Sequence, residues 1–209
     1  MAFPLRFDEA RLISQLMDLP NELRVAFAAL CAERQLPNYI RFSTKSGIGN
    51  PSVLTEALSS IWDDLQQRSV SNAQLATILE RCMALIPTGE EDTDEETAYA
   101  EDAAASVAYT IRARLAGDPQ EAAWAARRAY EAVDHFILSQ LNPAIVEQDL
   151  EGVVIAHPLA QAELKRQQAD LRDLHSVSGE NRFPARVISE LRDRARHDAE
   201  LFLTTANQH

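Results

Sequence analysis

Apolar residues recur every three or four positions along most of the chain, which is the spacing of one face of an α-helix. In residues 20–34, for example, Leu23, Ala26, Phe27 and Leu30 share one face. No segment shows a convincing alternation of apolar and polar residues, the pattern of a half-buried strand. Alanine, the best helix former, supplies 33 residues, whereas glycine supplies only 6. The sequence therefore predicts an all-α protein.

Capping residues and helix breakers mark where the predicted helices begin and end. Four N-terminal capping signals are present: Asn50-Pro51, Ser71 with Gln74, Thr93 with Glu96, and Asp118-Pro119. Gly47 and Gly117 predict helix ends. The pattern predicts eight or nine helices, mostly antiparallel to their neighbours, over residues 8–17, 20–34, 37–47, 51–65, 71–86, 94–116, 118–141, 158–175 and 184–203. Residues 143–157 are the least regular, and their run Val153, Val154 and Ile155 is compatible with an extended stretch or a buried short turn.

The length of 209 residues, 46% of them hydrophobic, suits one domain with a core over about residues 8–204. No apolar run approaches the ~18 residues that would cross a membrane. The first residues, MAFPLRFDEARL, lack the apolar core of a signal peptide. Cys31 and Cys82 lie on apolar stripes and are expected to be reduced, buried thiols. We therefore expect a cytoplasmic protein that does not associate with membranes.

Negative charge is concentrated in the middle of the chain. The formal net charge is −12, and residues 51–100 hold ten acidic and two basic residues. Nucleic-acid binding depends largely on basic residues that face phosphates. We therefore rank binding through Arg34, Arg41 and Lys45 third among the functional hypotheses and expect no nucleic-acid partner.

The only positive quarter of the chain gathers three cations, Arg34, Arg41 and Lys45, with Asn38 and Tyr39 between them. They precede a predicted helix N-terminus, where the helix dipole and free N–H groups favour an anion. These residues are a candidate site for a phosphate or carboxylate. The favoured interpretation is structural, with Arg34 paired to an internal carboxylate and the neighbouring residues serving helix boundaries.

One face of the predicted helix 94–116 carries Tyr99, Asp102 and Ser106. A carboxylate buried in an alanine-rich helix is costly without a partner. One interpretation makes Arg34 the partner of Asp102, in an internal ion pair that fixes the helix register. The other places Asp102 and Tyr99 in a small polar pocket. We favour the ion pair.

Two pairs of residues, Glu131 with His135 and Asp193 with His197, combine a carboxylate and an imidazole at i, i+4. Such groups on paired bundle helices can bind iron, manganese or zinc. The di-metal signature has i, i+3 spacing, however, and arginines accompany both pairs. Solvated, salt-bridged helix faces explain the pairs more simply, so we predict no cofactor.

Motifs in the first half of the chain resemble a bacterial family. The chain carries Cys31-x-Glu33-Arg34-x-x-Pro37-Asn38-Tyr39-x-x-Phe42, then Gly47-x-Gly49, Leu58-x-x-Ile61-Trp62, Leu79-Glu80, and Asp102-Ala103 with Ser106. In these residues it resembles the YjaG-like family, known as domain of unknown function 416, most clearly over residues 20–115. The resemblance implies a compact, all-helical cytoplasmic protein and implies no activity.

The sequence contains no G-x-S-x-G elbow, phosphate-binding P-loop, H-E-x-x-H or C-x-x-C motif. The favoured function is therefore a non-enzymatic interaction or scaffold protein. Trp62, Trp124 and Tyr130 are the candidate exposed aromatics for a homodimer or partner surface. The alternative is an enzyme or binding protein that uses the small-anion site or the metal pairs in a helical bundle.

Overall fold

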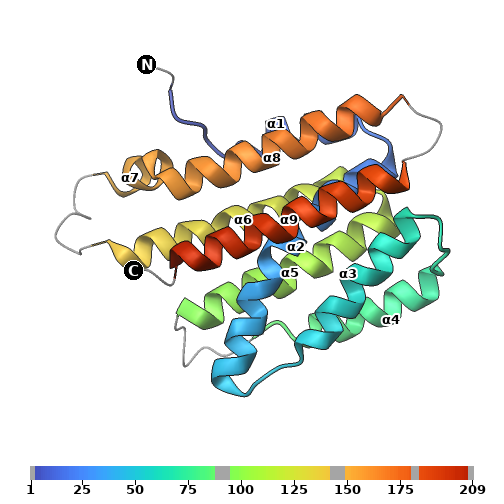
Figure 1. Ribbon diagram of the computed structural model, residues 1–209, viewed down its shortest axis with the longest axis horizontal. Coiled ribbons are helices and arrows are strands. Elements are labelled where there is room, and N and C mark those ends of the chain that lie inside the picture. Colours follow the sequence, from blue (N-terminus) through green and yellow to red (C-terminus); the bar gives the residue numbers. More distant parts are fainter. Residues whose placement is uncertain (1–2, 88–94, 142–148, 180–183, 207–209) are drawn as a thin grey trace.

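The computed structural model describes residues 3–87, 95–141, 149–179 and 184–206. Within these ranges the chain forms nine α-helices and no strand (Figure 1). The helices are α1 (Glu9–Met17), α2 (Asn21–Ser46), α3 (Pro51–Leu65), α4 (Asn72–Met83), α5 (Glu95–Ala116), α6 (Pro119–Gln140), α7 (Leu150–Ala156), α8 (Pro158–Val177) and α9 (Ala185–Ala206). The all-α prediction is confirmed.

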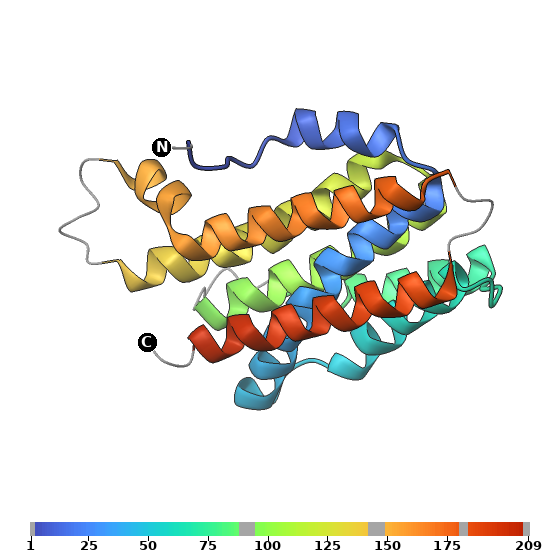
Figure 2. The ribbon, with the colours of Figure 1, turned by 45° about the horizontal axis from the view of Figure 1, so that its top comes forward.

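Helix α2 crosses the centre of the molecule and packs against α3, α5, α6, α8 and α9 (Figure 2). Every residue from Val25 to Gln35 is buried. A helix that is buried on all sides needs small side chains where its neighbours come close. Fully buried alanines supply them in α2, at Ala26, Ala28, Ala29 and Ala32, and both α5 and α6 are similarly rich in buried alanine. The same buried stretch carries two charged residues, Glu33 and Arg34.

Helix α2 continues through Pro37 to Ser46, so the predicted break after Arg34 is wrong. Proline in a helix interior removes a backbone hydrogen bond and costs about 3 kcal/mol. Here the helix is held in the core on both sides, by the buried residues up to Gln35 and by Tyr39 beyond. Burial of both halves outweighs the local cost of the proline.

The predicted caps at Asn50, Ser71 and Asp118 are confirmed, because each side chain accepts a hydrogen bond from a backbone N–H in the first helical turn. The predicted ends are confirmed too. Gly47 follows α2 with φ 71°, and Gly117 follows α5 with φ 70°. Both glycines take the left-handed conformation that ends many helices.

Other boundaries differ from the prediction or lie outside the described residues. Helix α4 ends at Met83, earlier than expected. The run 153–155 lies within helix α7, so the extended alternative is wrong. The side chain of Asp149 caps this helix, and its β-branched residues are partly or fully buried. Thr93 and residues 142–148 lie outside the described part of the chain.

Both cysteines are buried as free thiols, as predicted. Burial raises the pKa of Cys82 to about 12, and burial also raises the pKa of Cys31. Both thiols are therefore protonated at neutral pH and unreactive. None of the described helices has the length and apolar character needed to cross a membrane.

Candidate binding site

The predicted anion-site cations Arg41 and Lys45 bind a carboxylate on α5. Arg41 Nε donates to Glu96 Oε2 at 2.9 Å, and Lys45 Nζ donates to Glu96 Oε1 at 2.6 Å. The Arg41 guanidinium also lies 5.6 Å from the centre of the Tyr99 ring. These contacts tie the end of α2 to the start of α5.

Three neutral members of the candidate polar site, Asn38, Tyr39 and Ser106, are buried and hydrogen-bonded within the core, and the fourth, Tyr99, is buried as well. Asn38 donates to the glutamine side chain one turn earlier at 3.0 Å, and the Tyr39 hydroxyl donates to the Leu85 carbonyl at 3.3 Å. Ser106 Oγ donates to the Ala125 carbonyl at 3.1 Å. The structure therefore distributes these residues over several helix contacts and does not bring them to one cavity.

Arg34 is only 4% exposed and forms ion pairs with two carboxylates on α8. Its Nη1 donates to Asp170 Oδ2 at 2.7 Å, and its Nη2 donates to Glu163 Oε1 at 3.2 Å. The expected pair with Asp102 is wrong. Burial opposes the charge, but the two carboxylates outweigh it and raise the pKa of Arg34 above its usual value. The guanidinium therefore stays charged inside the core.

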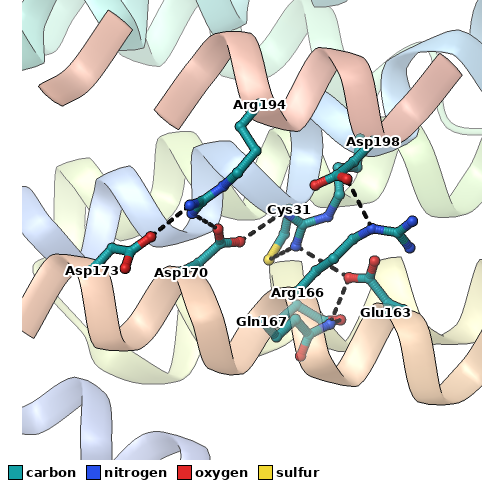
Figure 3. A network of polar contacts seen from close by, with 10 residues as sticks. Cys31, Glu163, Arg166, Gln167, Asp170, Asp173, Arg194 and Asp198 are labelled. Carbon is teal, nitrogen blue, oxygen red and sulfur yellow. Dashed lines mark hydrogen bonds and ion pairs between the residues drawn. The ribbon is translucent and has the colours of Figure 1, made fainter. Parts of the chain in front are cut away.

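Asp170 also binds α9, together with its α8 neighbours Asp173 and Arg166 (Figure 3). Arg194 lies between Asp170 and Asp173, with contacts of 2.7 Å and 2.6 Å. A parallel ion pair joins Arg166 to Asp198 at 3.2 Å. One polar network therefore connects α2, α8 and α9, and we call it the Arg34 network.

Glu33 is the second buried charge of α2, with 2% exposure. It accepts hydrogen bonds from Trp62 Nε1 at 3.0 Å, Arg192 Nε at 3.1 Å and Arg196 Nε at 2.6 Å. Trp62 is fully buried, so the expectation that it is exposed is wrong. A tryptophan can be buried completely when its indole N–H has an acceptor, and Glu33 provides one.

The other two aromatic candidates are partly buried. The Trp124 ring lies 5.3 Å from the Tyr109 ring and 5.9 Å from the Arg112 guanidinium. Tyr130 stacks on Phe7 at 5.5 Å with 18° between the rings. The three predicted aromatics therefore serve different contacts, and Tyr130 lines an open cavity.

Asp102, which is 1% exposed, is held by side chains of α6. Its Oδ1 accepts from Arg128 Nη1 at 3.1 Å, and its Oδ2 lies 3.1 Å from His135 Nδ1. The hydrogen bond to Asp102 raises the pKa of His135, against the effect of partial burial. The pair favours the protonated imidazole and joins α5 to α6.

Among the described residues, neither candidate metal pair is joined by enough further ligands to hold a metal ion. Glu131 binds Arg127 and Arg128 at 2.8 Å and 3.2 Å, while His135 faces Asp102. Asp193 and His197 are exposed on α9. In the part of the chain that the structure describes, no three His, Cys, Asp or Glu side chains are grouped so as to hold a metal ion.

Replacing His135 by glutamine is expected to remove a pH-dependent part of the stability. The folded pKa is raised, so the ion pair stabilises fully below the unfolded value of about 6.5 and loses its effect as pH rises through the folded value. The side chain is 42% exposed, so we expect an effect below about 1 kcal/mol. Urea unfolding should show a larger difference from wild type at about pH 5.5 than at about pH 8.5. A difference that grows with pH would contradict the ion pair.

An open cavity of about 750 Å³ lies between α6, α7 and the segment that precedes α1. Its aromatic wall is the stack of Phe7 on Tyr130. Leu138, Val154 and Ile155 add apolar surface. Sequence reasoning missed this cavity, although Tyr130 and Leu138 share one face of α6, two turns apart.

Carboxylates outnumber cations around this cavity. Its charged lining residues are Glu9, Glu131, Asp134 and Glu151, together with Arg6 and Arg127. The three glutamates each pair with one of the arginines, whereas no ion pair or hydrogen bond of Asp134 is found among the described residues.

The cavity therefore has a negative potential. Burial raises the pKa of Asp134, as does Glu131, while His135 opposes the shift. Burial also raises the pKa of Tyr130, with Asp134 and Glu151 adding to the effect. Negative charges near a phenol disfavour its ionised form. An aromatic wall beside a carboxylate that forms no ion pair among the described residues suits an organic cation.

The fold and its sites define an all-helical protein with a buried ionic network and an acidic, aromatic-walled cavity. Residues 11–200 match the family described as "Protein of unknown function (DUF416)", and the chain belongs to this family. The resemblance predicted from the motifs is thereby confirmed.

A solved structure shares the fold. The crystal structure of a DUF416 family protein from Shewanella baltica OS155 superposes with a TM-score of 0.76 at 21% identity. The match covers 88% of this chain and 93% of the other. No curated protein matches the sequence.

Proposed function

We propose that this chain is a non-enzymatic cytoplasmic interaction protein that binds a cationic, partly apolar group of a partner in the α6–α7 cavity. The observation that carries the proposal is Asp134, a partly buried carboxylate in the cavity of the Phe7–Tyr130 stack that forms no hydrogen bond or ion pair among the described residues.

Charge and shape support this ligand class. A cation in the cavity would neutralise Asp134, and its apolar part would contact Tyr130 and Leu138. Desolvated contacts between cations and aromatic rings contribute roughly 0.5–2 kcal/mol, and hydrogen bonds to charged groups about 1.5–3 kcal/mol. The protein's net charge of −12 attracts cationic partners before contact.

The polar groups of the small-anion alternative have structural contacts instead. Arg34 is buried against two carboxylates, and Arg41 and Lys45 share Glu96. An anion at either place would have to displace a carboxylate that is already bound. These contacts favour an architectural role for the cations, so the acidic cavity supports the better proposal.

Phenethylamine, which joins an ammonium group to an aromatic ring, is a suitable probe of the cavity. We expect millimolar binding, as is usual for so small a ligand, with NMR shift changes at Tyr130 and Leu138. Asp134→Asn should weaken binding about tenfold because it removes the charge partner.

Two controls make the result specific. Asp193→Asn alters an exposed carboxylate on α9 and should leave phenethylamine binding unchanged. Phenylacetate, which has the same ring with the opposite charge, should not bind. Equal affinity of wild type and Asp134→Asn for phenethylamine would refute the cationic site.

A further inference from the structure

The segment before α1 lies on the helices in the way that a bound peptide would. The N–H of Leu5 donates to Gln161 Oε1 at 2.9 Å, and Gln161 Nε2 donates to the Leu5 carbonyl at 2.8 Å. One side-chain amide on α8 therefore pairs with both polar groups of a single residue's backbone. The same Nε2 donates to the Ile155 carbonyl at 2.7 Å, which fixes the amide at the corner between α7 and α8.

The side chains of this segment alternate between the groove and solvent. Leu5 and Phe7 are partly buried, whereas Pro4, Arg6 and Asp8 are exposed. This is the two-residue period of an extended strand. Phe7 stacks on Tyr130, and Arg6 reaches Glu151 of α7 at 3.4 Å. The segment thus turns an apolar and an aromatic side chain toward the helices, with an exposed basic side chain between them.

Two cavities border the segment. The α6–α7 cavity includes Arg6 and Phe7 in its wall, and so does a second cavity of about 520 Å³ that extends along α8 to Leu171 and His175. The segment therefore lies across one longer groove and leaves space on either side of itself. Figure 2 shows the segment crossing beside α7 and α8 before it enters α1.

No residue from Pro4 to Asp8 is fully buried, and the segment is held by the Leu5–Gln161 hydrogen bonds, the Phe7–Tyr130 stack and one ion pair. The Arg6–Glu151 ion pair is solvent-exposed at both ends, and such pairs contribute little. Segments with few buried contacts open far more often than the core does. The groove is therefore accessible to a competing segment.

We infer that the groove is a receptor for an extended peptide segment of a partner protein with an apolar–basic–aromatic sequence, and that Leu5, Arg6 and Phe7 are its resident competitor. The inference rests on the proposed function, because the peptide would place its basic residue among the carboxylates of the same acidic cavity. Hydrogen bonds between Gln161 and the peptide backbone would contribute affinity without sequence preference. The two cavities would select the peptide side chains on either side of the paired residue.

Competition from the tethered segment sets the affinity that a partner needs. A segment joined to its site by a short linker acts at an effective concentration in the millimolar range. Weakening the tethered segment should therefore raise the apparent affinity for a peptide supplied in trans by at least about tenfold.

The test uses the full chain with the substitutions Arg6→Glu and Phe7→Ser, which we call the released chain. The probe is a fluorescein-labelled peptide with the sequence of residues 2–9, AFPLRFDE, followed by fluorescence anisotropy. We expect the released chain to bind this peptide at least about tenfold more tightly than wild type does. Circular dichroism establishes that the released chain keeps its helical content.

Further variants test whether Gln161 and the peptide's arginine contribute to binding. Adding Gln161→Ala to the released chain should weaken peptide binding severalfold, whereas adding Gln140→Ala, at the exposed end of α6, should not. A peptide with glutamate in place of its arginine should bind more weakly than the original.

Three outcomes would overturn the inference. They are equal peptide affinity of wild-type and released chains, no binding to a released chain that remains folded, and a wild-type dimer that becomes a monomer on release. The last result, from sedimentation, would assign the groove to the segment of a second copy. If phenethylamine binding depends on Asp134 while the peptide fails to bind, the proposed function stands and only this inference falls.

Discussion

Arg34→Met is expected to lower the free energy of unfolding by about 3–5 kcal/mol, because it leaves Glu163 and Asp170 in the core without their cation. Methionine fills much of the volume of the arginine stem, so the loss reports mainly the charge and not a cavity. Urea unfolding followed by circular dichroism measures the change.

A matched control distinguishes the stability lost by breaking the Arg34 network from the effect of replacing any arginine by methionine. Arg186 pairs with Glu190 on the surface of α9, and Arg186→Met should leave the unfolding midpoint unchanged. Adding Glu163→Gln to Arg34→Met should restore part of the stability, since the amide carries no charge. Equal effects of Arg34→Met and Arg186→Met would show that the Arg34 network contributes no stability.

Gly49→Ala is expected to destabilise the protein by about 2–4 kcal/mol. Gly49 has φ 81°, which side chains other than glycine rarely adopt, and an added Cβ would overlap the hydroxyl of buried Tyr39 and lie 3.1 Å from its Cζ. The left-handed conformation and the overlap both contribute to the loss. Thermal unfolding measures it.

Gly47 is the control that measures the cost of the left-handed backbone conformation alone. It has φ 71° and open space around its missing Cβ, so Gly47→Ala should cost only about 1–2 kcal/mol. In a Tyr39→Phe background the cost of Gly49→Ala should fall, because the phenol oxygen that the new methyl group meets is gone. A cost of Gly49→Ala no greater than that of Gly47→Ala would disprove the close packing on Tyr39.

Local sequence signals were reliable where a single turn decides the structure. Asn50, Ser71 and Asp118 cap the helices that they were expected to cap, and Gly47 and Gly117 end theirs. Each of these caps and helix ends provides hydrogen bonds for backbone groups only a few residues away in the sequence. Pro37 is the exception, because its local preference was overridden by burial on both sides.

Local sequence signals could not identify which residues form ion pairs between distant helices. The sequence indicated that Arg34 and Asp102 each need an internal partner, and both are buried in ion pairs. It did not indicate that their partners lie on α8 and α6. A signal was nevertheless present, because Glu163, Gln167 and Asp170 form a polar row beside the apolar stripe of α8.

The sequence by itself determined the helical class, most helix boundaries, the buried thiols and the need for internal charge compensation. These features follow from periodicity, capping chemistry and desolvation, which act within a helix or on a single side chain. Only the tertiary structure decided which helices share a charge, that Trp62 is buried on Glu33, and that the segment before α1 borders an acidic cavity. Those contacts join residues far apart in the chain, and their geometry depends on how the helices pack.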